Sequence, residues 1–243
     1  MPLKQVADVS VVWQPAKIFR KDRLKTISIF CSTDQGRTAE EITSRLIPIL
    51  DDEQQDWPLG CIYELGGEYE TSGKANASIA EQLPIAGLII LLLIVGQFNS
   101  FRRTLLILMT IPLGIIGVTT GLLVVRSYFG FMTLLGIISL SGIIINNAIV
   151  LIDRIRIEIE ENRHDPPRAV IEASQRRLRP ILLTTVTTIG GLLPLWLGGG
   201  PMWEPMAISI IFGLGFATVL TLGVVPSLYS IFFRVRFKTF EYS

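Results

Sequence analysis

The chain contains little of the chemistry on which metalloproteins and hydrolytic enzymes depend. Its 243 residues include one histidine, His164, and two cysteines, Cys31 and Cys61. Two cysteines are too few for a disulfide framework, and the lone histidine lacks the ligand spacing of a zinc site. No serine or cysteine has a base nearby in the sequence that would activate it as a nucleophile. We therefore expect a protein that is not an enzyme and that holds no metal or other cofactor.

The sequence also lacks an excess of charge of either sign. Its 22 Lys and Arg residues balance 21 Asp and Glu residues, so charge does not indicate a nucleic-acid partner. The mean hydropathy of +0.50 is high for a water-soluble protein. Charged residues gather in the first 80 positions and in residues 153–179, and long apolar runs separate these regions. The N-terminal part therefore has water as its solvent, and much of the rest has lipid.

The polar N-terminal region has the pattern of a small α/β unit. Residues 25–31, KTISIFC, are rich in β-branched side chains and predict a strand, as do residues 61–67, CIYELGG. Between them, residues 38–50 have apolar positions at helical spacing, and Thr38 with Glu41 forms a possible capping box. A β-α-β unit of this kind has parallel strands joined by a right-handed crossover.

This arrangement also bears on the two cysteines. Cys31 would end the first strand and Cys61 would begin the second. In a parallel pair these positions lie at opposite ends of the sheet, beyond the reach of a disulfide bond. We therefore expect two free thiols.

Five long apolar segments follow, and each meets or approaches the roughly 20 residues that a membrane-spanning helix needs. They lie at about residues 79–98, 103–125, 132–153, 180–197 and 206–233. Five such runs in succession exceed what a soluble domain of this size can bury, so we expect five transmembrane helices. Pro112, Pro194 and Pro226 fall inside these segments and predict kinks.

Arginine and lysine are unevenly distributed between the predicted loops. The turn after the first helix, the loop after the third and the C-terminal tail are basic, whereas the alternate loops carry Arg126 as their single cation. Basic loops stay on the cytoplasmic side, so the N-terminal unit is predicted to be extracytoplasmic. The opening MPLKQVADVSVVWQP has no secretory signal. The sequence therefore predicts that this chain is the C-terminal portion of a larger protein.

The long basic loop has a helical pattern of its own. Asp165 is a suitable N-cap, Pro166 or Pro167 suits the first helical position, and the helix should run to about residue 178. With arginines on one face, it is predicted to lie along the inner membrane surface. A plain solvated loop helix is the alternative.

Two adjacent amides, Asn146 and Asn147, interrupt the third apolar segment, and an acid, Asp153, follows. An amide in hydrocarbon is costly unless it is hydrogen-bonded, so these side chains should face other helices. Neighbouring helical positions point about 100° apart, so the two amides should face different neighbours. Thr184 and Thr185 supply hydroxyls at a similar depth. Polar side chains of this kind serve either as contacts between helices or as part of an ion pathway.

Five segments, in a constant order and spacing from residue 2 to about residue 235, carry a family resemblance. They are PLKQVADVSVVW, GQFNSFRRTLLILMTIPLGIIGV, GIIINNAIVLID, QRRLRPILLTTVTTIGGLLPLWLGGG and FATVLTLGVVPSLYSIFF. The chain resembles the C-terminal end of resistance-nodulation-division (RND) multidrug efflux pumps of the hydrophobe/amphiphile branch. The resemblance implies a polytopic α-helical membrane protein, in which a partial periplasmic α/β porter subdomain precedes five transmembrane helices of the second half of an RND transmembrane domain.

The resemblance also implies a division into three parts. Residues 1–20 are similar to the end of the funnel, or docking, subdomain. Residues 21–75 are similar to a partial porter subdomain with a ferredoxin-like β-α-β unit. Residues 76–243 are similar to a transmembrane domain, and the five helices would be the eighth to twelfth of the family's twelve.

A proton pathway is the main functional implication. In the family, a pair of aspartates on the fourth helix faces a lysine on the tenth, and Asn146 stands at the lysine position. Asn147 matches an asparagine, and Asp153 matches an acid at the cytoplasmic end, where we expect it to anchor the helix at the interface. Thr184 matches a relay threonine on the eleventh helix, and Arg177 matches a basic residue before it. Asparagine carries no charge, so the coupling must be rearranged, with hydrogen bonds that steady the carboxylates.

The expected function is therefore the C-terminal part of a proton-driven transporter that exports drugs or other amphiphiles from the bacterial inner (cytoplasmic) membrane. The expected partners are the lipid bilayer, the N-terminal part of the same pump and, at full length, a homotrimer with a periplasmic adaptor and an outer-membrane channel. The resemblance implies no cofactor other than the proton motive force, and the chain alone is expected to be inactive. The alternatives are an RND transporter of lipids or other amphiphiles, and a non-functional gene remnant or scaffold.

Overall fold

The computed structural model describes residues 17–32 and 37–235. By its internal contacts the chain divides into two units, Met1–Thr33 and Asp34–Ser243. Most of the segment predicted to end a docking subdomain, residues 1–20, lies outside the described residues. The predicted domain boundaries remain predictions.

The first unit contains a short antiparallel hairpin. β1 (Phe19–Lys21) pairs with β2 (Leu24–Thr26), with Phe19 opposite Thr26. The turn residues Asp22 and Arg23 have positive φ angles of 50° and 70°. Two successive positive φ values are typical of the type I′ turn, whose twist matches that of the flanking strands.

The prediction of a β-α-β unit with parallel strands is wrong for the described residues. Residues 27–31 and 61–66 have no strand structure. The apolar side chains of the first predicted strand are almost fully exposed: Ile27 91%, Ile29 86% and Phe30 93%. A β-rich sequence forms a strand only where neighbouring strands supply cross-strand contacts, and the described residues supply none here. Cys31 and Cys61 are free and exposed, which confirms the prediction of free thiols but not the sheet geometry behind it.

The helix predicted between those strands is present as α1 (Ala39–Glu53). The Oγ1 atom of Thr38 accepts a hydrogen bond from the backbone N–H of Glu41 at 3.1 Å, so Thr38 is the predicted N-cap. The Glu41 carboxylate pairs with Arg45 at 2.8 Å. Because no bond from Glu41 back to Thr38 is present, only one half of the predicted capping box forms.

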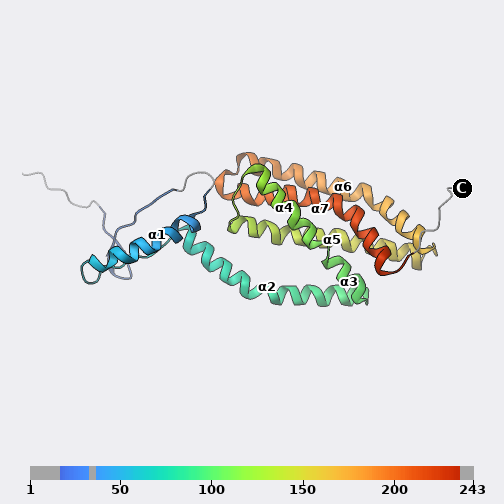
Figure 1. Cartoon of the computed structure of the whole chain (residues 1–243), viewed down its shortest axis with the longest axis horizontal. Coiled ribbons are helices and arrows are strands. Elements are labelled where there is room, and N and C mark those ends of the chain that lie inside the picture. Colours follow the sequence, from blue (N-terminus) through green and yellow to red (C-terminus); the bar gives the residue numbers. More distant parts are fainter. Residues whose placement is uncertain (1–16, 33–36, 236–243) are drawn as a thin grey trace, which may run out of the picture. The chain divides into compact units, whose positions relative to one another are not determined.

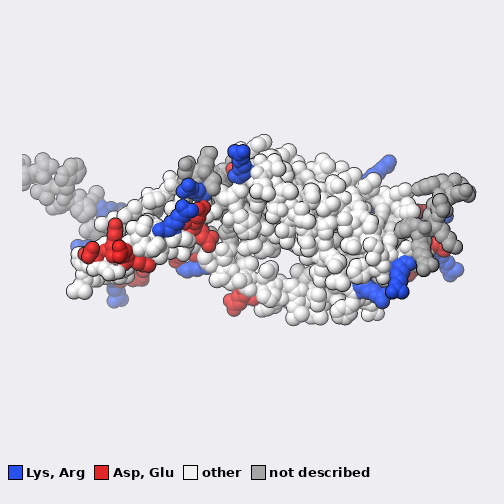
Figure 2. Space-filling model, viewed as in Figure 1, with Lys and Arg blue, Asp and Glu red and all other residues white. Residues whose placement is uncertain are grey.

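The five long apolar helices confirm that the chain is a polytopic α-helical membrane protein. They are α2 (Glu68–Phe98), α3 with α4 (Phe101–Val125), α5 (Phe131–Glu160), α6 (Pro166–Gly198) and α7 (Gly200–Phe232). On the face seen in Figure 2, the surface of the bundle between its ends is almost free of charged side chains. Such an uncharged surface between two charged ends suits the hydrocarbon core of a bilayer.

The second membrane segment is interrupted near Pro112, as predicted. α3 (Phe101–Leu108) ends before Thr110, and α4 (Ile111–Val125) then begins with Pro112 in its first turn. Proline has no backbone N–H and its ring crowds the preceding turn, so a helix breaks or restarts at this position. Pro194 and Pro226 instead lie within the continuous helices α6 and α7.

α6 is one helix of 33 residues, where the sequence predicted two. The surface helix predicted for residues 165–178 is wrong as a separate element, because these residues form the first part of α6. Its apolar side is not available to lipid: Val170 and Ala173 are buried in a cluster with Ile152 and Ile155 of α5. Packing against α5 therefore replaces the predicted membrane-surface contact.

α7 is the central helix of the bundle and packs against α4, α5 and α6 (Figure 1). Its contact with α4 is close because α4 presents glycines. A Cβ atom added at Gly121 would lie 2.4 Å from the Cβ of Phe212, and one at Gly117 would lie 2.7 Å from the Cβ of Phe216. Small residues let membrane helices approach closely and gain packing contacts that lipid cannot supply.

Candidate functional site

The predicted site residues of α5 lie on a side of that helix that is largely open. Asn146 is exposed, and Asn147 and Asp153 are half-buried. The helical repeat places Asn146 and Asp153, seven residues apart, on nearly the same side. Gly142 belongs to this side as well, and a Cβ atom added there would meet nothing within 4 Å. α5 therefore presents a small and polar face that the described helices leave uncovered.

α6 carries a comparable face. Thr184 is exposed and Arg177, seven residues earlier, is half-buried. The hydroxyl of Thr184 donates to the carbonyl oxygen of Ile181 at 2.9 Å, and that of Thr188 donates to the carbonyl oxygen of Thr184 at 2.8 Å. Both hydroxyl protons are thus used within the helix, and the Thr184 oxygen keeps an open side on which it can accept a hydrogen bond.

The neighbouring hydroxyl, that of Thr185, has a different role. It is buried, and its Oγ1 atom lies 2.9 Å from the Oγ1 atom of Thr218 on α7. This hydrogen bond joins α6 to α7 inside the bundle. The run TTVTT, residues 184–188, therefore supplies one buried contact between helices and several hydroxyls on the open side.

The five predicted site residues are not linked to one another in the described chain. No hydrogen bond or ion pair among the described residues joins any two of their side chains. The two amides, which were expected to face different neighbours, differ in burial: Asn147 is half-buried and Asn146 is exposed among the described residues. Their roles in a proton pathway remain predictions.

A buried carboxylate at the C-terminal end of α5 forms a second polar site. The side chain of Glu158 is 0% exposed. Its Oε1 atom lies 2.6 Å from Nη2 of Arg154 and 3.1 Å from Nη1 of Arg176 on α6. Its Oε2 atom accepts a hydrogen bond from Nδ2 of Asn162 at 2.6 Å. A buried charge needs such partners, so Glu158 joins α5, the following loop and α6 in one network.

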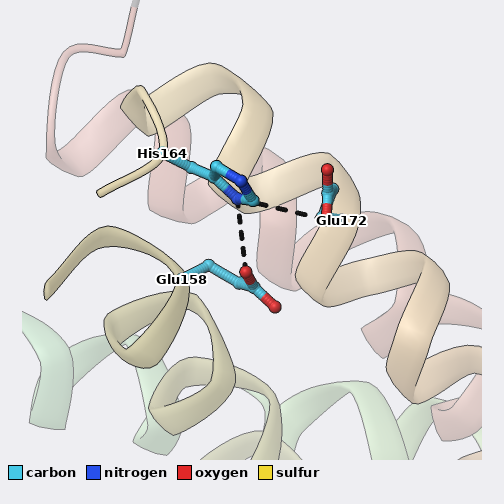
Figure 3. Close-up of side chains that lie close together, drawn as sticks. All are labelled: Glu158, His164 and Glu172. Atoms are coloured by element: carbon cyan, nitrogen blue, oxygen red, sulfur yellow. Dashed lines mark ion pairs between the residues drawn. The ribbon is translucent and has the colours of Figure 1, made fainter. Parts of the chain in front are cut away.

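Glu172 extends this network on α6. Its Oε2 atom lies 3.2 Å from Nη2 of Arg176, and its Oε1 atom lies 3.1 Å from Nε of Arg168. Figure 3 shows His164 between the two carboxylates: its Nδ1 atom is 3.3 Å from Oε2 of Glu158 and 4.0 Å from Oε2 of Glu172. The histidine that looked isolated in the sequence therefore has two acidic neighbours.

The ligand atoms of Glu158, His164 and Glu172 lie within 4.8 Å of one another, which is close enough to surround a metal ion. The charges around these three residues argue against a metal site. Three arginine side chains already pair with the two carboxylates, so the group carries an excess of positive charge before any cation enters. A divalent cation would have to displace these guanidinium groups from short contacts. The arrangement is therefore an ion-pair network that holds two helices together.

The sequence contained only a weak signal of this network. Arg154 and Glu158 are four residues apart, as are Glu172 and Arg176. Such spacing is ordinary on exposed helices, where each pair adds a few tenths of a kcal/mol. What distinguishes Glu158 is its burial, and burial depends on where α6 packs.

Known proteins resemble the chain over most of its length. Residues 1–233 match the AcrB/AcrD/AcrF family. The chain is 36% identical over 178 residues to the swarming motility protein SwrC of Bacillus subtilis (strain 168). It is 31% identical over 182 residues to the nickel and cobalt resistance protein CnrA of Cupriavidus metallidurans, and 34% identical over 163 residues to the multidrug resistance protein MdtC of Escherichia coli.

These matches cover 69%, 74% and 64% of this chain but only 17%, 17% and 16% of the relatives. The crystal structure of a heavy metal efflux pump is also similar, with a TM-score of 0.65 and 28% sequence identity. That similarity covers 82% of this chain and 20% of the pump. The chain thus spans about a fifth or less of the length of the proteins that it matches.

Proposed function

Since the chain belongs to the AcrB/AcrD/AcrF family of RND efflux transporters, we propose that it acts as the C-terminal membrane part of a proton-driven exporter of drugs or other amphiphiles. In this proposal it works in the bacterial inner membrane, with its N-terminal unit in the periplasm. It acts together with the remaining segments of the same pump. At full length, the pump forms a homotrimer with a periplasmic adaptor and an outer-membrane channel.

The observation that carries the proposal is the uncovered polar face of α5. Asn146 is exposed near the middle of a 30-residue apolar helix, and Asp153 lies on nearly the same side. Polar side chains within a membrane face the interior of a bundle or a water-filled path, because lipid offers them no hydrogen bonds. This face therefore suits contact with a polar helix from the rest of the pump.

Asn146 also restricts how such a pump is driven. A proton-driven exporter needs a group in the membrane that binds and releases protons. The amides of Asn146 and Asn147 do not titrate, and neither does the hydroxyl of Thr184 near neutral pH. In this proposal the titrating carboxylates lie on a helix outside this chain, and Asn146 donates hydrogen bonds that hold them in position.

A paired comparison of α5 variants tests the proposal in a transporter that carries this chain as its C-terminal part. Asn147→Ala should reduce drug resistance, because it strands a hydrogen-bonding partner deep in the membrane. Asp153→Asn should leave resistance near the wild-type level, because this side chain can reach interfacial water. Resistance is measured in an efflux-deficient strain at matched expression. Near-wild-type resistance in both variants would remove Asn147 from the mechanism.

The substrate class is tested in the same strain. The named relatives include a multidrug resistance protein and a nickel and cobalt resistance protein. We propose drugs or other amphiphiles as substrates, with lipids as the alternative within the same chemistry. Resistance to dyes and detergents but not to nickel or cobalt is the expected outcome. Protection against the metals alone would exclude the amphiphile proposal, and no protection of any kind in a correctly inserted pump would favour a non-functional remnant.

A further inference from the structure

The polar side chains of α6 have different partners on the two sides of Pro180. In its first part, Val170 and Ala173 are buried in a cluster that contains residues of both α5 and α7, and Arg176 pairs with Glu158 of α5. In its membrane part, Thr185 bonds Thr218 of α7 at 2.9 Å, and a ring contact with α7 follows nearer the C-terminal end. Pro180 lies between these two parts, at an exposed position. The ion pair to α5 and the hydroxyl bond to α7 therefore lie on either side of one proline.

The first part of α6 is anchored by a buried charge. The carboxylate of Glu158 is in contact with side chains from three elements: Arg154 of α5, Asn162 and His164 of the loop, and Arg176 of α6. The backbone N–H of His164 also donates to the carbonyl oxygen of Glu158 at 3.0 Å, which folds the loop back onto α5. Sliding this part of α6 along α5 would remove Arg176 from a fully buried carboxylate and leave Arg154 of α5 as its remaining arginine partner among the described residues. Breaking a buried ion pair in this way is strongly unfavourable.

Pro180 weakens α6 just beyond this anchor. Proline has no N–H, so the carbonyl oxygen of Arg176 lacks the donor that a helix normally supplies four residues later. Proline is also the commonest site of helix bending. Pro180 lies four residues after Arg176 and four before Thr184. The weak point thus separates the anchored part of α6 from the part that carries the open hydroxyls.

We propose that Glu158 and Arg176 are positioning residues that fix the first part of α6 to α5, and that the remainder of α6 pivots at Pro180. The role of this pivot rests on the proposed transport function. In each transport cycle, the pivot changes the distance between the open face of α5 and the open face of α6. The ion-pair network is the fixed point of this movement. Thr184 is on the moving part, and Asn146 is on the helix that stays in place.

The anchor is tested by hydrogen exchange of residues 166–176 in the membrane-inserted chain. Glu158→Gln keeps the shape of the side chain but removes its charge, so protection of these amides should fall at least about tenfold. Asp153→Asn is the matched control, because it neutralises a half-buried carboxylate of α5 that makes no salt bridge to α6 among the described residues, and it should leave protection unchanged. Unchanged protection in Glu158→Gln would overturn the anchor.

A second variant covers the case in which Glu158→Gln does not insert. Arg176→Lys retains the charge. The lysine has a single terminal nitrogen, so it cannot pair with Glu158 and Glu172 through two separate nitrogens, as Nη1 and Nη2 of the guanidinium do. It should insert and show an intermediate loss of protection in residues 166–176. Wild-type protection in this variant would also contradict the anchor.

The pivot is tested by distances rather than by transport. Spin labels are placed at two open positions, Gly142 of α5 and Leu183 of α6, after Cys31 and Cys61 have been replaced by serine. The wild-type chain should give a broad distance distribution, Pro180→Ala should narrow it, and Pro194→Ala, a second exposed proline of α6, should not. The same distribution in Pro180→Ala and wild type would overturn the pivot.

Transport rates then show whether the pivot at Pro180 takes part in transport or affects only the stability of the bundle. In an active pump, Pro180→Ala should reduce kcat by about tenfold at unchanged KM, because a stiffened helix slows a conformational step. Pro194→Ala should stay near the wild-type rate. Equal rates in the two variants would show that the pivot has no part in transport. A wild-type pump without transport would refute the proposed function, and the distance and exchange measurements would still decide the pivot and the anchor.

Discussion

The contact between α4 and α7 leads to a prediction with a defined sign. Gly121 has no space for a side chain: a Cβ atom would lie 2.4 Å from Cβ and 2.5 Å from Cγ of Phe212. Carbon atoms normally approach to about 3.5–4.0 Å. Gly121→Ala therefore forces the two helices apart or drives Phe212 out of its preferred conformation. We expect this single methyl group to destabilise the bundle.

The magnitude follows from two opposing effects. Overpacking in a close-packed interior costs about 1–3 kcal/mol, and an overlap with the first two carbons of a side chain belongs at the upper end. Replacing glycine by alanine inside a helix gains about 1 kcal/mol of helix propensity. The expected net loss is about 2 kcal/mol, which corresponds to roughly a thirtyfold change in the unfolding equilibrium constant.

Gly223 on α7 is the matched control. It is exposed, and a Cβ atom there would meet nothing within 4 Å. Gly223→Ala should therefore be neutral or stabilising, by up to about 1 kcal/mol. The assay is reversible unfolding of the chain in mixed detergent micelles, followed by circular dichroism at a constant ratio of protein to detergent. If Gly121→Ala is as stable as Gly223→Ala, the close α4–α7 contact is not present in the membrane-inserted protein.

Three further predictions concern topology, an interhelical bond and the activity of the chain alone. Cys31 and Cys61 are free and exposed, so impermeant thiol reagents should label them in spheroplasts; labelling only after permeabilisation would reverse the orientation inferred from the basic loops. Thr185→Val removes the 2.9 Å hydrogen bond to Thr218 and should lower the free energy of unfolding of the bundle by about 0.6–1.7 kcal/mol. Thr184→Val, on the open side of α6, should lower it by less than about half of that. Equal losses of stability in the two variants would show that the two hydroxyls have similar surroundings. The chain of residues 1–243, inserted alone into the membrane of an efflux-deficient strain, should give no proton-dependent dye efflux above the empty-vector level. The reason is that its deep polar side chains do not titrate near neutral pH. Efflux above that level would show that this chain couples proton movement to transport without the rest of the pump.

The sequence by itself determined the membrane-spanning character of the chain. Five apolar runs of sufficient length predict five spans, because a helix that satisfies its own backbone hydrogen bonds is the favoured way to place such runs in lipid. The restart of the helix at Pro112 was equally predictable, since it depends on the missing N–H of one residue. The N-cap of α1 at Thr38 is local for the same reason, because donor and acceptor lie three residues apart. The five collinear segments also identified the family, which the match over residues 1–233 confirms.

Tertiary structure decided the features that depend on a neighbour. Residues 27–31 have strand-forming side chains, but a strand needs partners and the described chain offers these residues none. Residues 165–178 have an amphipathic pattern that suits lipid, a loop or another helix equally, and only the packing of Val170 and Ala173 against α5 selects the last. Glu158 looks in the sequence like any interfacial acid, yet it is fully buried where α6 packs on α5, and Arg176 of α6, 18 residues away in the sequence, pairs with it there. Hydropathy and helical spacing act along the chain, whereas burial and ion pairing depend on which surfaces meet across the bundle.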